Sequence, residues 1–204
     1  MIAEPGETAR RGRGRRPIDE VRADVLRATG DIVLAEGIAR LTFERVAKAA
    51  GVSKTTIYKL WPSPGALAMD AYFHAVAGTL AFDDTGDVRA DLLAQLHSFA
   101  AVMRTPGGRA VLQLIGAAQT DADLAASYRA LYSTGRRALA CERLTRAQER
   151  GQIRPEVDVR VLVDQLWGAI YHRLLVPDEP VDDAFIDALV TNLFDGISVP
   201  KTVI

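Results

Sequence analysis

Apolar residues recur along the chain at intervals of three and four, and the alternation typical of strands is absent. Such spacing lines one face of a helix, so the sequence predicts an all-α fold. Glycine and proline residues punctuate the pattern and set the expected ends of the helices. The expected helices cover residues 17–36, 42–50, 53–60, 63–76, 87–103, 108–118, 121–150, 157–175 and 181–197.

Residues 42–60 carry the signals of two short helices joined by a tight turn. Thr42 and Ser53 stand where helix-capping residues are expected, and Gly51 separates the two helices. The small side chain of Ala47 allows the helices to cross closely. A helix, a tight glycine turn and a second helix together predict a helix-turn-helix.

The second of these helices has an apolar side and a polar side. On a helical wheel Ile57, Leu60 and Trp61 share one arc, whereas Thr55 and Lys59 point the other way. Further hydrogen-bond donors stand beside the polar side: Lys54, Thr56 and Tyr58. Side chains of this kind reach base edges in a major groove and bind phosphates. A solvated surface helix is the alternative that the spacing leaves open.

Charge divides the chain unevenly. Residues 1–60 carry 12 Lys/Arg and 8 Asp/Glu, a net of +4, and the remainder carries 13 and 18, a net of −5. The basic part suits a polyanion such as nucleic acid. Cys141 is the only cysteine, which favours a reducing cytoplasm. No apolar run reaches the roughly 18 residues of a membrane span, and no apolar signal segment follows the arginine-rich start. A cytoplasmic protein without membrane contact is therefore expected.

Residues 1–16 lack an apolar stripe, and we interpret them as a flexible basic arm. The arm holds five arginines: Arg10, Arg11, Arg13, Arg15 and Arg16. Such an arm can enter a minor groove beside a recognition helix. A disordered, solubilising tail is the alternative, and the position of the arm just before the first helix favours contact with DNA.

Residues 18–76 resemble the DNA-binding domain of the tetracycline-repressor (TetR) family of bacterial regulators. The matching strings are TFERVA at 42–47, AGVS at 50–53, TIY at 56–58 and WPS at 61–63. The resemblance implies a dimer of chains with about nine helices each. A helix-turn-helix domain over 17–62 would be joined by a connecting helix to an effector-binding and dimerisation domain over 63–204. It also implies a repressor that leaves a palindromic operator when a small molecule binds.

The resemblance assigns roles to particular side chains. Lys54, Thr55 and Lys59 fall where the family reads bases or nearby backbone. The expected phosphate contacts are Thr42, Arg45, Thr56 and Tyr58, and the predicted DNA-binding set also includes Ser53, Arg13, Arg15 and Arg16. Two positions depart from the family pattern, because Leu60 stands where histidine or arginine is common and Pro64 where lysine is common.

Two of the C-terminal helices are rich in apolar residues. Helix 157–175 shows two stripes, one with Leu162, Leu166, Ala169 and Ile170 and the other with Val163, Trp167, Tyr171 and Leu174. A helix that is apolar over so much of its girth needs partners on two sides. Either both stripes face the chain's own core, or a second copy covers one of them together with helix 181–197. The resemblance favours the homodimer.

An effector site is expected among apolar helices with scattered polar groups. The candidate contacts are Phe99, Met103, Leu112, Gln113, Tyr128, Tyr132, Trp167 and Tyr171, each of which is otherwise an ordinary core residue. The expected effector is small and largely apolar, and no cofactor is expected. Helix 63–76 would connect this site to DNA, because it starts directly after Trp61 and its far end can pack against the C-terminal helices.

Catalytic signatures are missing from the sequence. His74, His97, His172 and Cys141 lack metal-ligand spacing, and neither a G-x-S-x-G motif nor a P-loop is present. A regulator that is not an enzyme is therefore expected. Two other classes stay open: a helical ligand-binding or enzymatic protein with a vestigial DNA-binding domain, and an architectural DNA-binding protein without an effector.

Overall fold

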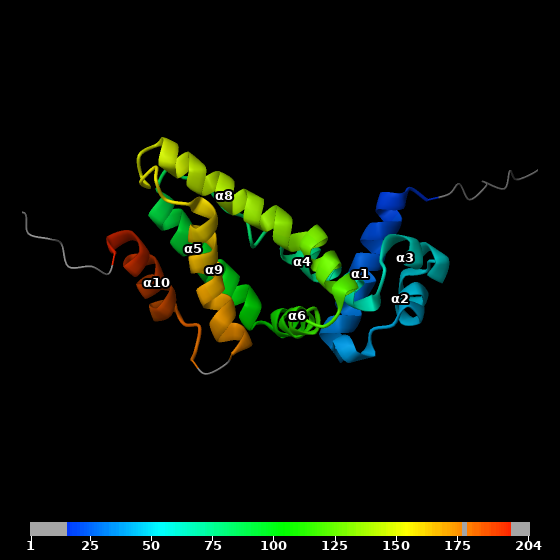
Figure 1. The fold of residues 1–204 in the computed structure, drawn as a ribbon. Coiled ribbons are helices and arrows are strands. Elements are labelled where there is room, and N and C mark those ends of the chain that lie inside the picture. The colour runs from blue at the N-terminus through cyan, green and yellow to red at the C-terminus, as the bar shows by residue number, and fades with distance from the viewer. Residues whose placement is uncertain (1–15, 177–178, 197–204) are drawn as a thin grey trace, which may run out of the picture.

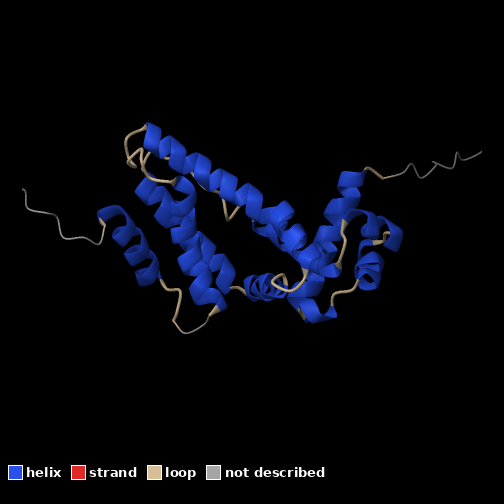
Figure 2. Cartoon of the chain, viewed as in Figure 1, coloured by secondary structure: helices blue, strands red, loops and turns tan. Residues whose placement is uncertain are grey.

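The structure is a computed structural model that describes residues 16–176 and 179–196. Every regular element in these two ranges is helical, which confirms the all-α prediction (Figure 2). The N-terminal elements are α1 (Ile18–Glu36), a 3₁₀ turn (Ile38–Arg40), α2 (Phe43–Ala50), α3 (Lys54–Leu60) and α4 (Pro64–Val76). They are followed by α5 (Val88–Arg104), α6 (Pro106–Ala117), α7 (Ala122–Tyr128), α8 (Thr134–Glu149), α9 (Val159–Leu175) and α10 (Asp183–Asp195).

The helix expected over 121–150 is interrupted by a π-helical turn at Arg129–Ser133. The residues on both sides of the turn keep right-handed helical angles, so α7 and α8 form one rod. The described part of the chain therefore contains nine helical rods, in agreement with the sequence. A π turn adds a residue to the helical repeat, and it rotates the side chains that follow relative to an unbroken α-helix.

The helices α1, α2 and α3 form a small domain at one end of the molecule (Figure 1). Its core contains Val25, Val46 and Ile57, each 0% exposed. Helix α4 leaves this domain and packs along α1, and side chains from α6 and α7 join the same apolar cluster. The two ends of the molecule are thus connected through α4, α6 and α7.

The helices α5, α8, α9 and α10 surround a second apolar core. Its fully buried members include Leu92, Leu96, Leu144, Leu166, Ile170 and Ile186. Helix α10 packs against α5 at the end of the molecule farthest from α1–α3 (Figure 1). Residues of both predicted stripes of α9 lie against this core, and Trp167, Tyr171 and Leu174 of the second stripe are only partly buried in the single chain.

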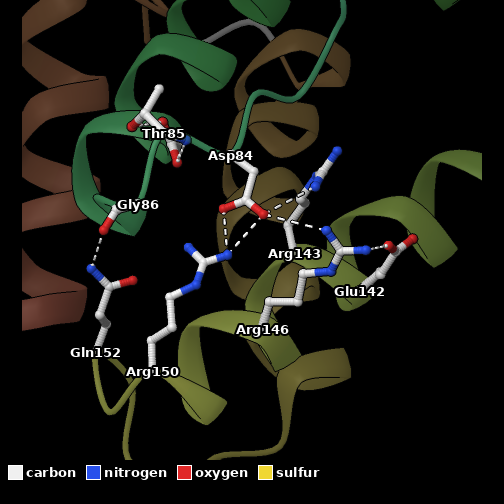
Figure 3. Close-up of polar contacts among 9 residues, drawn as sticks. Asp84, Thr85, Gly86, Glu142, Arg143, Arg146, Arg150 and Gln152 are labelled. Atoms are coloured by element: carbon white, nitrogen blue, oxygen red, sulfur yellow. Dashed lines mark hydrogen bonds and ion pairs between the residues drawn. The ribbon is translucent and has the colours of Figure 1, made fainter.

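The loop between α4 and α5 is fixed to α8 by charge (Figure 3). The Asp84 carboxylate accepts hydrogen bonds from Arg150 at 2.6 and 2.8 Å, from Arg143 at 3.2 Å and from Arg146 at 3.4 Å. The hydrogen bond from Arg150 lowers the pKa of Asp84. The side chain of Gln152 also donates to the Gly86 carbonyl at 2.6 Å. The loop between α4 and α5 is therefore anchored to the end of α8 and the residues that follow it.

Candidate functional site

The turn between α2 and α3 has the predicted caps. The Thr42 hydroxyl oxygen accepts a hydrogen bond from the Arg45 backbone N–H at 3.3 Å, and the Ser53 hydroxyl oxygen accepts one from the Thr56 backbone N–H at 3.2 Å. Gly51 ends α2 with φ of 65°, a left-handed conformation that side chains disfavour. These local interactions set the angle between α3 and α2.

Helix α3 has the predicted two sides. Ile57 and Trp61 are 0% and 2% exposed, whereas Thr55, Tyr58 and Lys59 are exposed. The Tyr58 ring packs edge-on against Phe43, with ring centroids 4.7 Å apart, so its hydroxyl is held at the surface. The outer side therefore presents two hydroxyls and an ammonium group on a supported helix.

Two of the predicted DNA contacts are held by acidic residues of the same chain. Lys54 lies 2.6 Å from Glu44, and Arg45 pairs with Glu36. The hydrogen bond to Glu44 raises the pKa of Lys54. Lys59 has no ion pair within residues 16–176 and 179–196, so its charge is directly available to a ligand. These pairs join separate helices, and helical spacing gives no signal for them.

The arginines of the arm lie mostly outside the described residues. Arg16 is described, and it pairs with Asp24 of α1. The predicted roles of Arg13 and Arg15 stay predictions.

The end of α3 is tied to α4 and α1 through one buried carboxylate. Asp70 of α4 is 7% exposed and accepts a hydrogen bond from the Trp61 indole N–H at 2.8 Å. Arg22 of α1 pairs with the same carboxylate, and its guanidinium lies 5.8 Å from the centroid of the Trp61 ring. Asp70 thus links α4 to α1 and to Trp61, the residue at which α3 ends, and gives a path by which a movement of α4 can reach α3.

A cavity of about 90 Å³ opens between α7, α8 and α9. Its walls are Phe82, Tyr128, Tyr132, Ser133, Arg136, Arg137, Ala140, Val163, Trp167 and Tyr171. Five of these ten residues are aromatic, which is typical of a small-molecule site. Four of the eight predicted effector contacts lie here: Tyr128, Tyr132, Trp167 and Tyr171.

The other four candidates lie elsewhere. Phe99 and Met103 are each 1% exposed in the core, and Phe99 meets Tyr171 edge-on at 5.3 Å. Leu112 is half-buried between the two cores, and Gln113 is exposed. Six lining residues were absent from the predicted set: Phe82, Ser133, Arg136, Arg137, Ala140 and Val163. The π turn is one reason, because it changes which residues of α8 face α9.

The cavity wall reaches α4 directly. The ring of Phe73 stacks on Tyr132 with centroids 3.5 Å apart and planes at 11°. Phe73 follows Asp70 by three residues, which is about one helical turn. A continuous series of contacts thus runs from the cavity through Tyr132, Phe73 and Asp70 to Trp61 at the end of α3.

Two family models match the chain. The model for bacterial regulatory proteins of the tetR family matches residues 25–68, and the model for the tetracyclin repressor-like C-terminal domain matches residues 82–193, more than half of the chain. The chain belongs to the TetR family. Regulators of this family bind DNA operators, act as dimers and bind small-molecule effectors. The function inferred from the sequence, a ligand-responsive DNA-binding regulator, agrees with this membership.

Known members of the TetR family cover most of the chain. The uncharacterized HTH-type transcriptional regulator YdeS of Bacillus subtilis is 33% identical over 89% of this chain and 92% of its own length. The DNA-binding transcriptional repressor TetR of Mycobacteroides abscessus is 30% identical over 85% of this chain and 92% of its own. These relatives are named as transcriptional regulators.

Solved structures have the same fold. The TetR family transcription regulator SCO0332 is 73% identical with a TM-score of 0.83, covering 88% of this chain and 100% of that one. FadR of Thermus thermophilus is 20% identical with a TM-score of 0.59, covering 90% and 98%. In the chain described here, none of the helices within residues 16–176 and 179–196 has the length and apolar character that a membrane span requires.

Proposed function

We propose that this chain is a cytoplasmic repressor that binds a palindromic operator through α3 and leaves it when a small molecule enters the cavity between α7, α8 and α9. The observation that carries the proposal is the series of contacts from Tyr132 to Trp61, which joins the cavity to the C-terminal end of α3. An architectural DNA-binding protein needs no such connection, and a vestigial DNA-binding domain needs no supported recognition helix.

DNA fragments selected by the purified chain would supply the operator for the test. Anisotropy titrations of that operator with and without candidate ligands then measure release. The proposal requires both sequence-selective binding and its weakening by a ligand. Selective binding that no ligand alters would favour the architectural alternative, and absence of selective binding would favour the vestigial domain.

Lys59→Ala is expected to change the preferred sequence and to cost about 1–3 kcal/mol at the operator, because its free ammonium group lies on the outer side of α3. Tyr58→Phe should weaken binding to all sequences alike, since its hydroxyl is assigned to a phosphate. The charge-matched control is Lys48→Ala on α2, which should leave the preference intact. Selection of bound fragments by each variant measures both properties. An unchanged preference in Lys59→Ala would contradict the assigned recognition side.

The dimer proposed through 157–175 and 181–197 rests on a side of α9 that the chain itself does not cover. Val161, Gln165, Gly168 and His172 are all exposed, at spacings of four, three and four residues. This stripe carries no Asp, Glu, Lys or Arg, and Val161 is 52% exposed. An uncharged helical stripe of this length suits a two-fold packing of α9 and α10 against a second copy.

Gly168→Arg is expected to convert the dimer to a monomer. A Cβ at Gly168 would meet no side chain or neighbouring element within 4 Å beyond its own helix backbone and adjacent residues, so the substitution is expected to spare the fold of one copy while placing a charge at the centre of the stripe. Gly116→Arg on α6 is the control, because its Cβ position is equally open. Sedimentation should give roughly twice 22.1 kDa for the parent and the control. A dimeric Gly168→Arg protein would place the interface elsewhere.

A further inference from the structure

The cavity contains one positive charge that no carboxylate of the described chain balances. Two arginines line it, and Arg137 is paired with Asp164. Arg136 has no ion pair in the part of the chain that the structure describes. Its guanidinium instead donates a hydrogen bond to the side-chain oxygen of Gln95 at 2.9 Å. Gln95 is 2% exposed, and in this orientation its amide nitrogen donates to the Ala81 carbonyl at 2.6 Å. A neutral group therefore fixes the direction of Arg136 and leaves its charge uncompensated.

Part of the Arg136 guanidinium remains open to a ligand. A guanidinium carries five N–H donors in one plane; one of its nitrogens is engaged by Gln95, and the Tyr132 hydroxyl lies close enough to accept from it as well. A planar group with two acceptor oxygens, such as a carboxylate, matches that fork. The ten lining residues include no Asp or Glu that would repel an anion.

A second donor faces the same cavity. The hydroxyls of Tyr128 and Tyr171 lie 3.1 Å apart, so one of them donates to the other. The second hydroxyl proton has no acceptor within the described ranges. Burial raises the pKa of both tyrosines, which keeps them protonated near neutral pH. An oxygen of a ligand would complete this pair.

Size and shape limit the remainder of the ligand. An apolar cavity of about 150 Å³ holds a benzene molecule, so a cavity of about 90 Å³ that opens to the surface limits the ligand to about one ring. Five aromatic side chains supply flat walls, and among them Phe82 and Trp167 have a centroid distance of 6.2 Å and Tyr128 and Tyr132 one of 5.9 Å. A single ring with one small substituent has this size and stacks on such walls.

We propose that the cavity binds a small aromatic carboxylic acid as its anion, with the carboxylate on Arg136 and the ring among Tyr128, Tyr132 and Trp167. The inference rests on the proposed function for its regulatory meaning, and it replaces a largely apolar effector with an anionic one. The bound acid would contact both Arg136 and Tyr132. Because Tyr132 stacks on Phe73 of α4, binding would act on the series of contacts that leads to α3.

Calorimetric titration of the full chain with benzoate and 4-hydroxybenzoate tests the proposal. The neutral benzamide and the non-aromatic cyclohexanecarboxylate are the matched probes. At least one aromatic acid should bind, about tenfold or more tighter than both matched probes, because a charge-assisted hydrogen bond is lost in one and ring stacking in the other. Binding of the amide as tight as that of the acid, or no binding of either acid at millimolar concentration, would overturn it.

Arg136→Gln should weaken binding of the acid by about 10- to 100-fold and leave the amide unchanged. Arg129→Gln is the control, since Arg129 is an exposed arginine of the same helical rod that does not line the cavity, and its effect should stay within about threefold. Equal losses in the two variants would mean that general electrostatics, and not Arg136, holds the ligand. Circular dichroism of Arg136→Gln separates a lost contact from a lost fold.

Operator titration distinguishes a failure of the proposed ligand class from a failure of the proposed repressor mechanism. An acid that binds through Arg136 without weakening operator binding would support the ligand class and contradict the proposed repressor mechanism. A neutral ligand that releases the operator would contradict the ligand class and leave the repressor mechanism intact.

Discussion

Gly108→Ala is expected to destabilise the protein by more than about 4 kcal/mol, an exceptional cost for one methyl group. A Cβ at this position would lie 2.4 Å from the Val102 carbonyl oxygen and 2.6 Å from the Met103 Cα. Both are backbone atoms at the end of α5, so no side-chain rotation relieves the overlap. The corner between α5 and α6 would have to open.

Gly116→Ala on the same helix is the matched control. Its Cβ position is open, so the same substitution should be neutral or stabilise by about 0.5–1 kcal/mol through helix propensity. Urea unfolding at one fixed protein concentration measures both, because dimer stability depends on concentration. Similar unfolding free energies for the two variants would show that the α5–α6 corner is not tightly packed.

The α5–α6 corner matters for function because α6 lies between the two cores. Val111, Leu114 and Ile115 of α6 belong to the apolar cluster of the DNA-binding end, while α5 belongs to the other core. The corner therefore sets how the cavity-bearing helices are placed relative to α4. A variant that opens it should lose ligand response along with stability.

The DNA-binding end was largely predictable from sequence because its signals are local. The caps at Thr42 and Ser53 and the turn at Gly51 act within a few residues of their own positions. The same local rules separate the buried Ile57 from the exposed Lys59 on a helix of seven residues. Contacts between helices were beyond these rules, as the pair of Lys54 with Glu44 illustrates.

The cavity was only half predictable, because it depends on how separate helices meet. Tyr128, Tyr132, Trp167 and Tyr171 were expected from their aromatic character. Arg136 was not expected in the cavity, since an arginine on a polar helix is normally solvated. Its place in the cavity wall depends on the π turn before it and on Gln95 from α5, neither of which has a distinct sequence pattern.

Phe73→Leu is expected to uncouple the cavity from DNA. The substitution keeps a buried apolar side chain but removes the stacking of Phe73 on Tyr132. The acid should still bind the free protein, and the operator should still bind the ligand-free protein, each within about threefold of the parent. The coupling between them, typically about 5–150-fold in affinity, should fall towards one. Anisotropy titrations of the operator at zero and saturating ligand give the coupling factor.

Phe99→Leu supplies the control for this loss. Phe99 is also buried and also meets a tyrosine of the cavity wall, but it belongs to α5 and its aromatic contact is with Tyr171 on α9. Its replacement costs similar packing while leaving the Phe73–Tyr132 contact in place, so coupling should persist. Linkage gives an internal check, because the operator must weaken ligand binding by the same factor by which the ligand weakens operator binding. If Phe73→Leu keeps the full factor, the signal leaves the cavity by another route, and α6, which touches α1, α4 and α9, becomes the element to test.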